Sequence, residues 1–342
     1  MSRPSPQLQP LLSVRHLKVH FRPRSIWARR RGWIRAVEDL HLDLRAGETL
    51  GIVGESGCGK SSLARTLIGL QAPTSGSIRY AGRELAGLSK KEWRSLRREL
   101  QMVFQDPLAS LDPRMTIGQI VAEPLRELCP EIPAAEHAAL VAAMLQRVGL
   151  APDIVDRLPQ EFSGGQAQRI GIARALIVRP KVLICDEAVS ALDVSVRAQI
   201  VNLLVELRQE YGLTLIFIAH DLDIVRYLCD RVLVMYLGKV MEQASAEDLF
   251  GNPRHPYTRA LMAAAPIGAA GQPPPLEDKK RKKPSGDMPS LEHPPMGCVF
   301  HTRCPLMESA CVASVPSLRR VGPEHYAACH FVAAPDQTQP RR

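Results

Sequence analysis

The sequence has no apolar run of the roughly 18 residues that a helix needs to cross a bilayer. Its first residues, MSRPSPQLQP, have no apolar core of the kind found in a secretory signal. If the protein works at a membrane, we therefore expect other chains to provide the membrane spans. Heptad repeats are missing as well, which argues against a coiled coil.

Acidic side chains are missing from the first 35 residues, which carry nine Lys and Arg. The chain of 342 residues has a formal net charge of +9, so the other 307 residues are neutral overall. We interpret the basic segment as a solvated loop, with a lipid-headgroup or partner contact and a targeting sequence as the alternatives. At 45% hydrophobic and 23% charged residues, the composition is that of an ordinary globular protein.

Strand and helix patterns alternate over residues 12–250 and predict an α/β fold with a largely parallel sheet covered by helices. Three short apolar runs, at 50–54, 182–186 and 215–220, have the length and flanks of buried strands. Helical patterns without a convincing strand predict a helical subdomain at about 106–178.

The character of the chain changes after a first domain at 1–250. Residues 251–290 contain one short helix and then a proline-rich, charged linker. Residues 291–333 form a cysteine-rich segment that is too short for much of a core of its own, and 334–342 form a tail.

A glycine-rich turn follows the predicted strand 50–54 and precedes a predicted helix, and it fits the phosphate-binding pattern G-x-x-x-x-G-K-[ST]. Such a turn surrounds phosphates with backbone N–H groups and a helix N-terminus. We expect Lys60 to reach the β- and γ-phosphates and Ser61 to place its hydroxyl on Mg²⁺. The candidate ATP-binding residues of this turn are Gly54, Glu55, Ser56, Gly57, Cys58, Gly59, Lys60, Ser61 and Ser62.

Two adjacent carboxylates close the predicted strand 182–186. Asp186 is placed to hold Mg²⁺ through water, and Glu187 is placed to polarise the water that attacks the nucleotide. Two acids at a strand end are ordinary on their own, but the phosphate-binding turn upstream favours the catalytic interpretation.

Further motifs resemble those of ABC ATPases. FSGGQAQRIGIARAL, at 162–176, resembles the signature motif of that family, and SALD, which ends at Asp193, resembles its D-loop. Gln105 resembles the Q-loop glutamine, and His220 resembles the switch histidine. The resemblance implies a P-loop NTPase (RecA-like) ABC nucleotide-binding domain with a helical subdomain, followed by a small cysteine-rich extension.

The same resemblance implies a head-to-tail dimer that encloses ATP and Mg²⁺ between two such domains. It implies catalytic roles for Gln105, Glu187 and His220. It places Mg²⁺ near Ser61, Gln105 and Asp186. The signature residues that would reach the nucleotide held by the partner are Ser163, Gly164, Gly165 and Gln166.

An aromatic side chain usually stacks on adenine, and the candidates are Phe21, Trp27 and Trp33. By its position at the end of the first predicted strand, Phe21 best resembles the stacking aromatic of the family, with residues 25–35 as an insertion after it. Each of the three rings is equally compatible with simple packing.

Finer motifs resemble the peptide and nickel importer branch, notably the F-type ATP-binding subunits of dipeptide and oligopeptide importers. These motifs are VFQDPLASLDPRMTIGQIVAEPL at 103–125, RHPYTRAL at 254–261 and GCVFHTRCP in the cysteine-rich segment. The resemblance implies an ATPase that powers peptide uptake and lies peripherally on the cytoplasmic face of the inner membrane. It implies as partners a second, paralogous ABC ATPase, two permease subunits and, indirectly, an extracytoplasmic solute-binding protein.

Two alternatives remain at this point. The same machinery could serve nickel, glutathione or another small solute, because the ATPase subunits do not touch the solute. A soluble ABC ATPase acting on nucleic acid or the ribosome is less favoured, because the chain has a single phosphate-binding turn and a single signature. We therefore expect no nucleic acid partner.

Four of the eight cysteines crowd into the C-terminal segment, separated by five, six and seventeen residues. This spacing is neither that of a zinc ribbon nor that of a compact ferredoxin. Four thiolates suit a tetrahedral zinc ion or a 4Fe–4S cluster, and the resemblance to peptide-importer ATPases favours the cluster, in a structural role. The expected ligands are Cys298, Cys304, Cys311 and Cys329.

Overall fold

The computed structural model describes residues 9–22, 32–190, 192–264 and 288–332. Several expectations fall outside these ranges: most of the charged linker, the tail at 334–342, Trp27 and one residue of the predicted D-loop. Within the described ranges, no helix is both long and apolar enough to cross a membrane.

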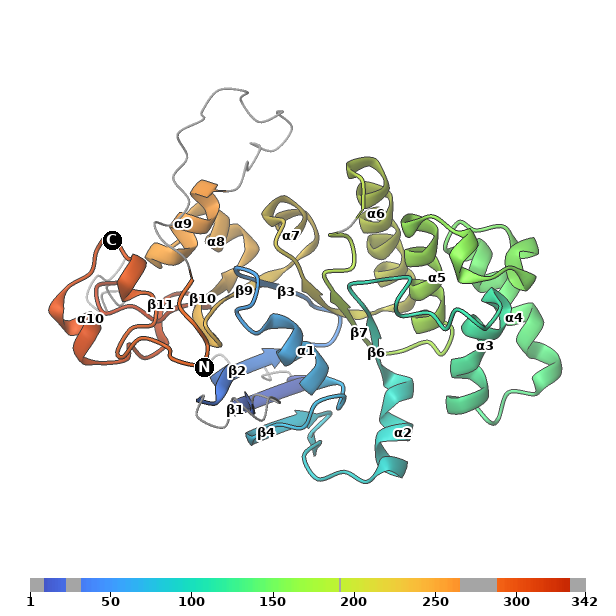
Figure 1. Cartoon of the computed structure of the whole chain (residues 1–342), viewed down its shortest axis with the longest axis horizontal. Coiled ribbons are helices and arrows are strands. Elements are labelled where there is room, and N and C mark those ends of the chain that lie inside the picture. The colour runs from blue at the N-terminus through green and yellow to red at the C-terminus, as the bar shows by residue number, and fades with distance from the viewer. Residues whose placement is uncertain (1–8, 23–31, 191, 265–287, 333–342) are drawn as a thin grey trace, which may run out of the picture.

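A mixed sheet forms the centre of the molecule (Figure 1). Its strands are β3 (Thr49–Val53), β6 (Leu100–Val103), β7 (Val182–Asp186), β8 (Thr214–Ile218), β9 (Arg231–Tyr236), β10 (Lys239–Ser245), β11 (Arg319–Gly322) and β12 (His325–Ala327). They follow the order β11-β12-β10-β9-β3-β8-β7-β6, parallel from β6 to β9 and antiparallel from β9 to β11. Every residue of β3, β7 and β8 is buried, as in parallel strands covered on both faces. The predicted α/β fold is confirmed.

A smaller antiparallel sheet lies beside the N-terminal end of the chain's first helix (Figure 1). Its strands are β1 (Leu12–Phe21), β2 (Ile34–Leu44), β4 (Ser75–Tyr80) and β5 (Arg83–Glu84), in the order β2-β1-β4-β5. Helix α1 (Lys60–Leu67) and one face of the central sheet share a hydrophobic core with this sheet. The basic N-terminal segment therefore contains a core strand, β1.

Helices cover the central sheet and form a separate lobe beyond β6. That lobe contains α3 (Ile117–Leu128), α4 (Ala134–Arg147) and α5 (Gly164–Leu176), with the short turns η2 (Pro152–Asp156) and η3 (Pro159–Glu161). The other helices are α2 (Lys90–Glu99), α6 (Val194–Tyr211), α7 (Leu222–Leu228), α8 (Ala246–Gly251), α9 (Pro256–Ala264), η4 (His301–Arg303) and α10 (Ser309–Ala313). In Figure 1 the green lobe of α3, α4 and α5 lies at the opposite end from the red C-terminal segment.

The cysteine-rich segment packs directly on the central sheet. β12 pairs with β10 and thereby extends the sheet beyond β10. Phe300 is fully buried, with its ring centroid 5.4 Å from that of Tyr236 and 5.2 Å from that of Tyr257. Cys298 and Cys311 belong to the same core cluster as the parallel strands. The segment therefore shares the main core instead of depending on one of its own.

Candidate functional site

The phosphate-binding turn between β3 and α1 requires glycine at two close contacts. Gly59, the N-cap of α1, has a φ of 108°, and a Cβ there would lie 1.9 Å from the carbonyl oxygen of Ala36. Gly54 has a φ of 152°, and a Cβ there would lie 2.2 Å from the carbonyl oxygen of Met235. The turn is thus held tightly against β2 and β9, and any larger residue would displace its backbone.

Lys60 begins α1, and its side chain lies inside the curve of this turn. Its residue is only 4% exposed, and the ammonium group donates to the carbonyls of Gly54 (2.8 Å) and Glu55 (3.1 Å). The same group lies 3.8 Å from a carboxylate oxygen of Glu187. Phosphate oxygens are stronger acceptors than carbonyls, so this ammonium is placed to exchange backbone contacts for a nucleotide.

Ser61 and Asp186 provide a set of oxygen donors beside Lys60. The Ser61 hydroxyl donates to Oδ1 of Asp186 over 2.9 Å, and Asp186 is 1% exposed at the carboxyl end of β7. Burial raises the pKa of Asp186, and the hydrogen bond from Ser61 partly offsets this effect. A divalent cation between the two side chains would favour the ionised carboxylate, and hard oxygen ligands suit Mg²⁺.

Gln105 and Glu187 come together from the ends of two neighbouring strands, β6 and β7. The Gln105 side-chain amide donates to Oε2 of Glu187 over 2.8 Å. Glu187 has a φ of 48°, which is uncommon for a residue other than glycine. Its carboxylate is therefore held between an amide donor and the Lys60 ammonium.

His220 follows β8 and is exposed to solvent. It lines a small hollow together with Glu187, Ser190 and Asp221. Arg197 closes this hollow through an ion pair with Asp221 at 2.9 Å. The structure thus places the predicted histidine and the predicted carboxylate around one space.

A cavity of about 280 Å³ joins these elements. Its lining residues are Phe21, Ile34, Ala36, Ser56, Gly57, Gly59, Lys60, Ser61, Ser62, Gln105, Glu187 and Leu291. Phe21 lines it as expected, whereas Trp33 is absent from the lining and stacks under the Arg22 guanidinium at 4.6 Å. No sequence motif points to Ile34, Ala36 and Leu291, which also line the cavity. These residues contribute apolar surface, for which no sequence motif exists.

The signature residues lie away from this cavity. Ser163 caps α5 and forms a reciprocal capping box with Gln166, and neither they nor the two glycines between them line the cavity. Ser163, Gly164 and Gln166 are exposed, as is Asp193 at the N-cap of α6. The chain therefore presents a second anion-receptive helix N-terminus to the outside, separate from its own phosphate-binding turn.

The four C-terminal cysteines form a loose cluster. Cys298, Cys311 and Cys329 are buried and Cys304 is half-buried. Burial, followed by the nearby thiols, raises the pKa of Cys298 to about 11. Among the described residues no three of these sulfur atoms lie within 4.8 Å of one another, whereas sulfurs around one tetrahedral zinc are about 3.8 Å apart. The thiols are thus neighbours, but at a wider spacing than a single ion requires.

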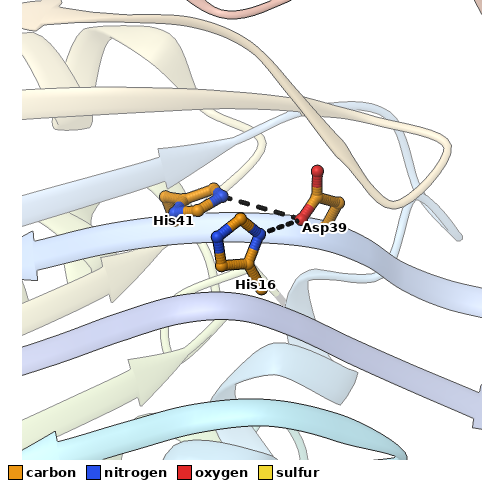
Figure 2. Close-up of side chains that lie close together, drawn as sticks. All are labelled: His16, Asp39 and His41. Atoms are coloured by element: carbon orange, nitrogen blue, oxygen red, sulfur yellow. Dashed lines mark hydrogen bonds and ion pairs between the residues drawn. The ribbon is translucent and has the colours of Figure 1, made fainter.

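Ligand-type atoms do meet closely at His16, Asp39 and His41 on the small sheet (Figure 2). Nδ1 of His16 lies 2.9 Å, and Nε2 of His41 3.6 Å, from Oδ1 of Asp39. His16 and Asp39 each occupy a β-bulge, one in β1 and one in β2, with φ of 50° and 54°. The hydrogen bond from His16 lowers the pKa of Asp39. The two facing bulges account for this exposed cluster as a feature of strand pairing.

Comparisons with known proteins agree with the site. The family model "ABC transporter" matches residues 37–190, and the model "Oligopeptide/dipeptide transporter, C-terminal region" matches residues 241–311. The chain is 53% identical over 313 residues to "Oligopeptide transport ATP-binding protein OppF" of Escherichia coli, covering 90% of this chain and 92% of that protein. The protein of the same name from Haemophilus influenzae is 51% identical over 323 residues, covering 93% of this chain and 96% of its own length.

A solved structure shares the fold of the first domain. It is described as a dimeric structure of a post-hydrolysis state of the ATP-binding cassette MJ0796 bound to ADP and Pi. The two chains are 26% identical with a TM-score of 0.62, over 69% of this chain and 98% of that one. Together with relatives about half identical over nearly the whole length, these matches show that the chain belongs to the ATP-hydrolysing ABC transporter proteins, in the branch that carries the oligopeptide/dipeptide transporter C-terminal region.

Proposed function

We propose that this chain powers the uptake of di- or oligopeptides as an ATP-hydrolysing subunit of a membrane importer. The observation that carries the proposal is a cavity lined by Lys60, Ser61 and the hydrogen-bonded pair Gln105–Glu187. Asp186 is hydrogen-bonded to Ser61 at its wall. The peptide substrate is supported by the relatives. They match this chain over almost their full length and are named as oligopeptide transport proteins.

Each residue of the cavity has a distinct part in the proposed hydrolysis. Lys60 and the N–H groups of the turn would bind the β- and γ-phosphates, and Phe21 would stack on adenine. Ser61, Asp186 and Gln105 would hold Mg²⁺, which neutralises charge on the phosphate oxygens when bound. Glu187 would accept a proton from the attacking water. The hydrogen bond from Gln105 and the nearby Lys60 ammonium would orient its carboxylate.

The active form is a dimer, as implied by the family. The exposed signature, Ser163 to Gln166, would complete the nucleotide site of the partner, with Asp193 and His220 at the same interface. We propose a second, paralogous ABC ATPase as that partner and two permease chains as the membrane part. A solute-binding protein outside the membrane would deliver the peptide to the permeases.

We propose that the helical subdomain, at about 106–178 within the domain 1–250, receives the permeases at the cytoplasmic face of the inner membrane. The short helix and linker at 251–290 would connect this domain to the cysteine-rich segment at 291–333. This arrangement is consistent with the position of α3, α4 and α5 in a lobe of their own (Figure 1).

We further propose that Cys298, Cys304, Cys311 and Cys329 hold a 4Fe–4S cluster with a structural role. The proposal is supported by four thiols in one folded segment, three of them buried and one half-buried, a donor set that suits an iron–sulfur cluster. The neighbouring histidines are engaged with backbone, since His301 contacts the carbonyl of Cys298 at 2.8 Å and His330 that of Ser314 at 3.0 Å. Iron and sulfide analysis of anaerobically purified protein tests this assignment. Stoichiometric zinc without visible absorbance would contradict it.

Affinity purification of the tagged chain from detergent-solubilised membranes, under anaerobic conditions, tests the importer. We expect two polytopic permeases and a second ATPase in the eluate. Ribosomes or nucleic acid in their place would contradict the proposal. The purified complex, reconstituted in liposomes with its binding protein, should then show ATPase activity that oligopeptides stimulate and that nickel or glutathione does not.

A further inference from the structure

The C-terminal part of the chain contacts the phosphate-binding turn at Glu55. Nη1 of Arg303 donates to both carboxylate oxygens of Glu55, at 2.9 and 3.1 Å. The backbone N–H of Glu55 donates to the hydroxyl of Tyr257 over 2.9 Å. Glu55 is thus held at two points by residues more than 200 positions later in the chain: Arg303 binds its side chain, and Tyr257 binds its backbone.

The surroundings of this contact are largely closed to water. The Arg303 side chain is 6% exposed and the Glu55 side chain 26%. Arg303 also donates to the hydroxyl of Tyr236 at 3.3 Å, and Phe300 packs against the rings of Tyr236 and Tyr257. Charges in such a place interact more strongly than at an open surface, because water screens them less.

Glu55 is a negative charge inside a turn that is otherwise built to attract anions. Without a cation beside it, its carboxylate would repel the phosphates of a nucleotide and would also be poorly solvated. Arg303 supplies that cation from the side of the turn that faces the C-terminal segment. Because Arg303 neutralises Glu55, the positive potential that a nucleotide meets at the turn is set by Lys60 and the backbone N–H groups.

The position of Arg303 depends on the fold of the cysteine-rich segment. Arg303 ends the short η4 turn, in which its N–H donates to Phe300 and the N–H of His301 donates to Cys298. Cys298 in turn donates its N–H to the carbonyl of Cys311 over 2.7 Å. The backbone that carries two of the cysteines thus also sets where the guanidinium lies.

We propose that Arg303 is a positioning residue for nucleotide binding: it neutralises and orients Glu55, and so couples the state of the C-terminal segment to the affinity of the phosphate-binding turn for ATP. This inference extends the ATPase function and is independent of which solute is transported.

Nucleotide affinity of the full-length chain tests the proposal, with a fluorescent ATP analogue and Mg²⁺ as the probe. Arg303→Met should weaken binding about tenfold, because it leaves the Glu55 carboxylate uncompensated. Adding Glu55→Gln to Arg303→Met should restore most of the lost affinity, because no carboxylate is then left to be compensated. A purely structural role for Arg303 predicts instead that the double variant binds no better than Arg303→Met.

The matched control is another ion pair between the C-terminal segment and the first domain, Arg45 with Glu324 at 2.5 Å. Arg45 precedes β3, at the opposite end of that strand from the turn, so Arg45→Met removes an ion pair without touching the turn and should leave affinity unchanged. Arg303→Lys keeps the charge but loses the planar guanidinium, which also donates to Tyr236, and should fall between wild type and Arg303→Met. Wild-type affinity for a folded Arg303→Met variant, judged by its thermal melting, would overturn the proposal. Failure of the wild-type chain itself to bind the analogue would instead contradict the ATPase function.

Discussion

Gln105 donates a hydrogen bond to Glu187 across 82 positions of sequence, joining the ends of two adjacent parallel strands. The loop after β6 leads into the helical lobe, and Glu187 faces the phosphate-binding turn. A displacement of that lobe would therefore shift the Glu187 carboxylate through this bond. This bond is a direct structural link between the helical lobe and the carboxylate that we propose as the general base.

Glu187→Gln should abolish ATP turnover while nucleotide binding persists. The amide keeps the size of the side chain and cannot accept a proton, and loss of a general base typically costs about 10²–10⁴ in rate. Phosphate release by the assembled complex measures the loss, and size-exclusion chromatography with ATP should reveal a stabilised dimer. Full activity of the variant complex would assign the base elsewhere.

Lys60→Ala should eliminate nucleotide binding, because the buried ammonium is the cation within the curve of the turn. Titration with a fluorescent ATP analogue checks this outcome. Lys91→Ala, at an exposed position of α2, is the matched control and should bind as wild type does. Equal affinities of the two variants would contradict the assignment of the phosphate site.

Gly59→Ala should disrupt the turn, since its Cβ would lie 1.9 Å from a backbone oxygen at a φ of 108°. We expect a destabilisation of about 3 kcal/mol together with loss of nucleotide binding. Gly82→Ala, at a φ of 80° with nothing within 4 Å, isolates the backbone strain alone and should cost about 1 kcal/mol without affecting binding. Chemical denaturation compares the two variants, and a similar small loss for both would show that the turn can relax.

His255 should make the protein less stable in mild acid. Burial lowers the pKa of this 1% exposed imidazole to about 4 from its ordinary 6.5. The unfolded chain therefore binds the proton more readily than the folded one between these values, so stability falls as pH drops from 6.5 towards 4. The full loss in the free energy of unfolding is of the order of 3 kcal/mol.

Urea denaturation at pH 5 and pH 7.5 measures this dependence. In His255→Gln the difference in the free energy of unfolding between the two pH values should shrink, while His137→Gln, at a half-buried position of α4, should leave it as in wild type. Glu242 acts in the same direction but at lower pH. Burial raises its pKa, hydrogen bonds from His325 and other donors outweigh that effect and lower it from 4.5, and its stabilising contribution is therefore lost only as pH falls below that ordinary value. An unchanged pH dependence in His255→Gln would contradict the assignment of the acid sensitivity between pH 7.5 and pH 5 to this imidazole.

The sequence motifs locate most of the cavity because each motif sits where a strand ends. The turn after β3 and the acids after β7 lie at the same edge of a parallel sheet, so strands recognised from short apolar runs bring Lys60 and Glu187 together. Phe21 could be selected by its position alone, and it does line the cavity.

The remaining contacts follow from tertiary packing that has no local pattern. Leu291 reaches the cavity wall because its carbonyl accepts the N–H of Arg35 on β2, and Arg303 reaches Glu55 across 248 positions. An arginine beside a cysteine gives no sign of such a partner. The core that the C-terminal segment shares with the first domain also has no sequence pattern. Phe300 packs against Tyr236 of β9 and Tyr257 of α9, and Cys298 belongs to the same core cluster.

The pairing of β12 with β10 also bears on the order in which the chain can mature. A ribosome delivers the N-terminal strands and the phosphate-binding turn first, while the strand that covers the edge of β10 comes more than 80 residues later. Until then that edge keeps unpaired backbone groups. Glu55 likewise acquires its partners late, Tyr257 first and Arg303 after it. A chain that ends before Arg303 therefore carries every ATPase motif while the carboxylate of Glu55 still lacks its cation.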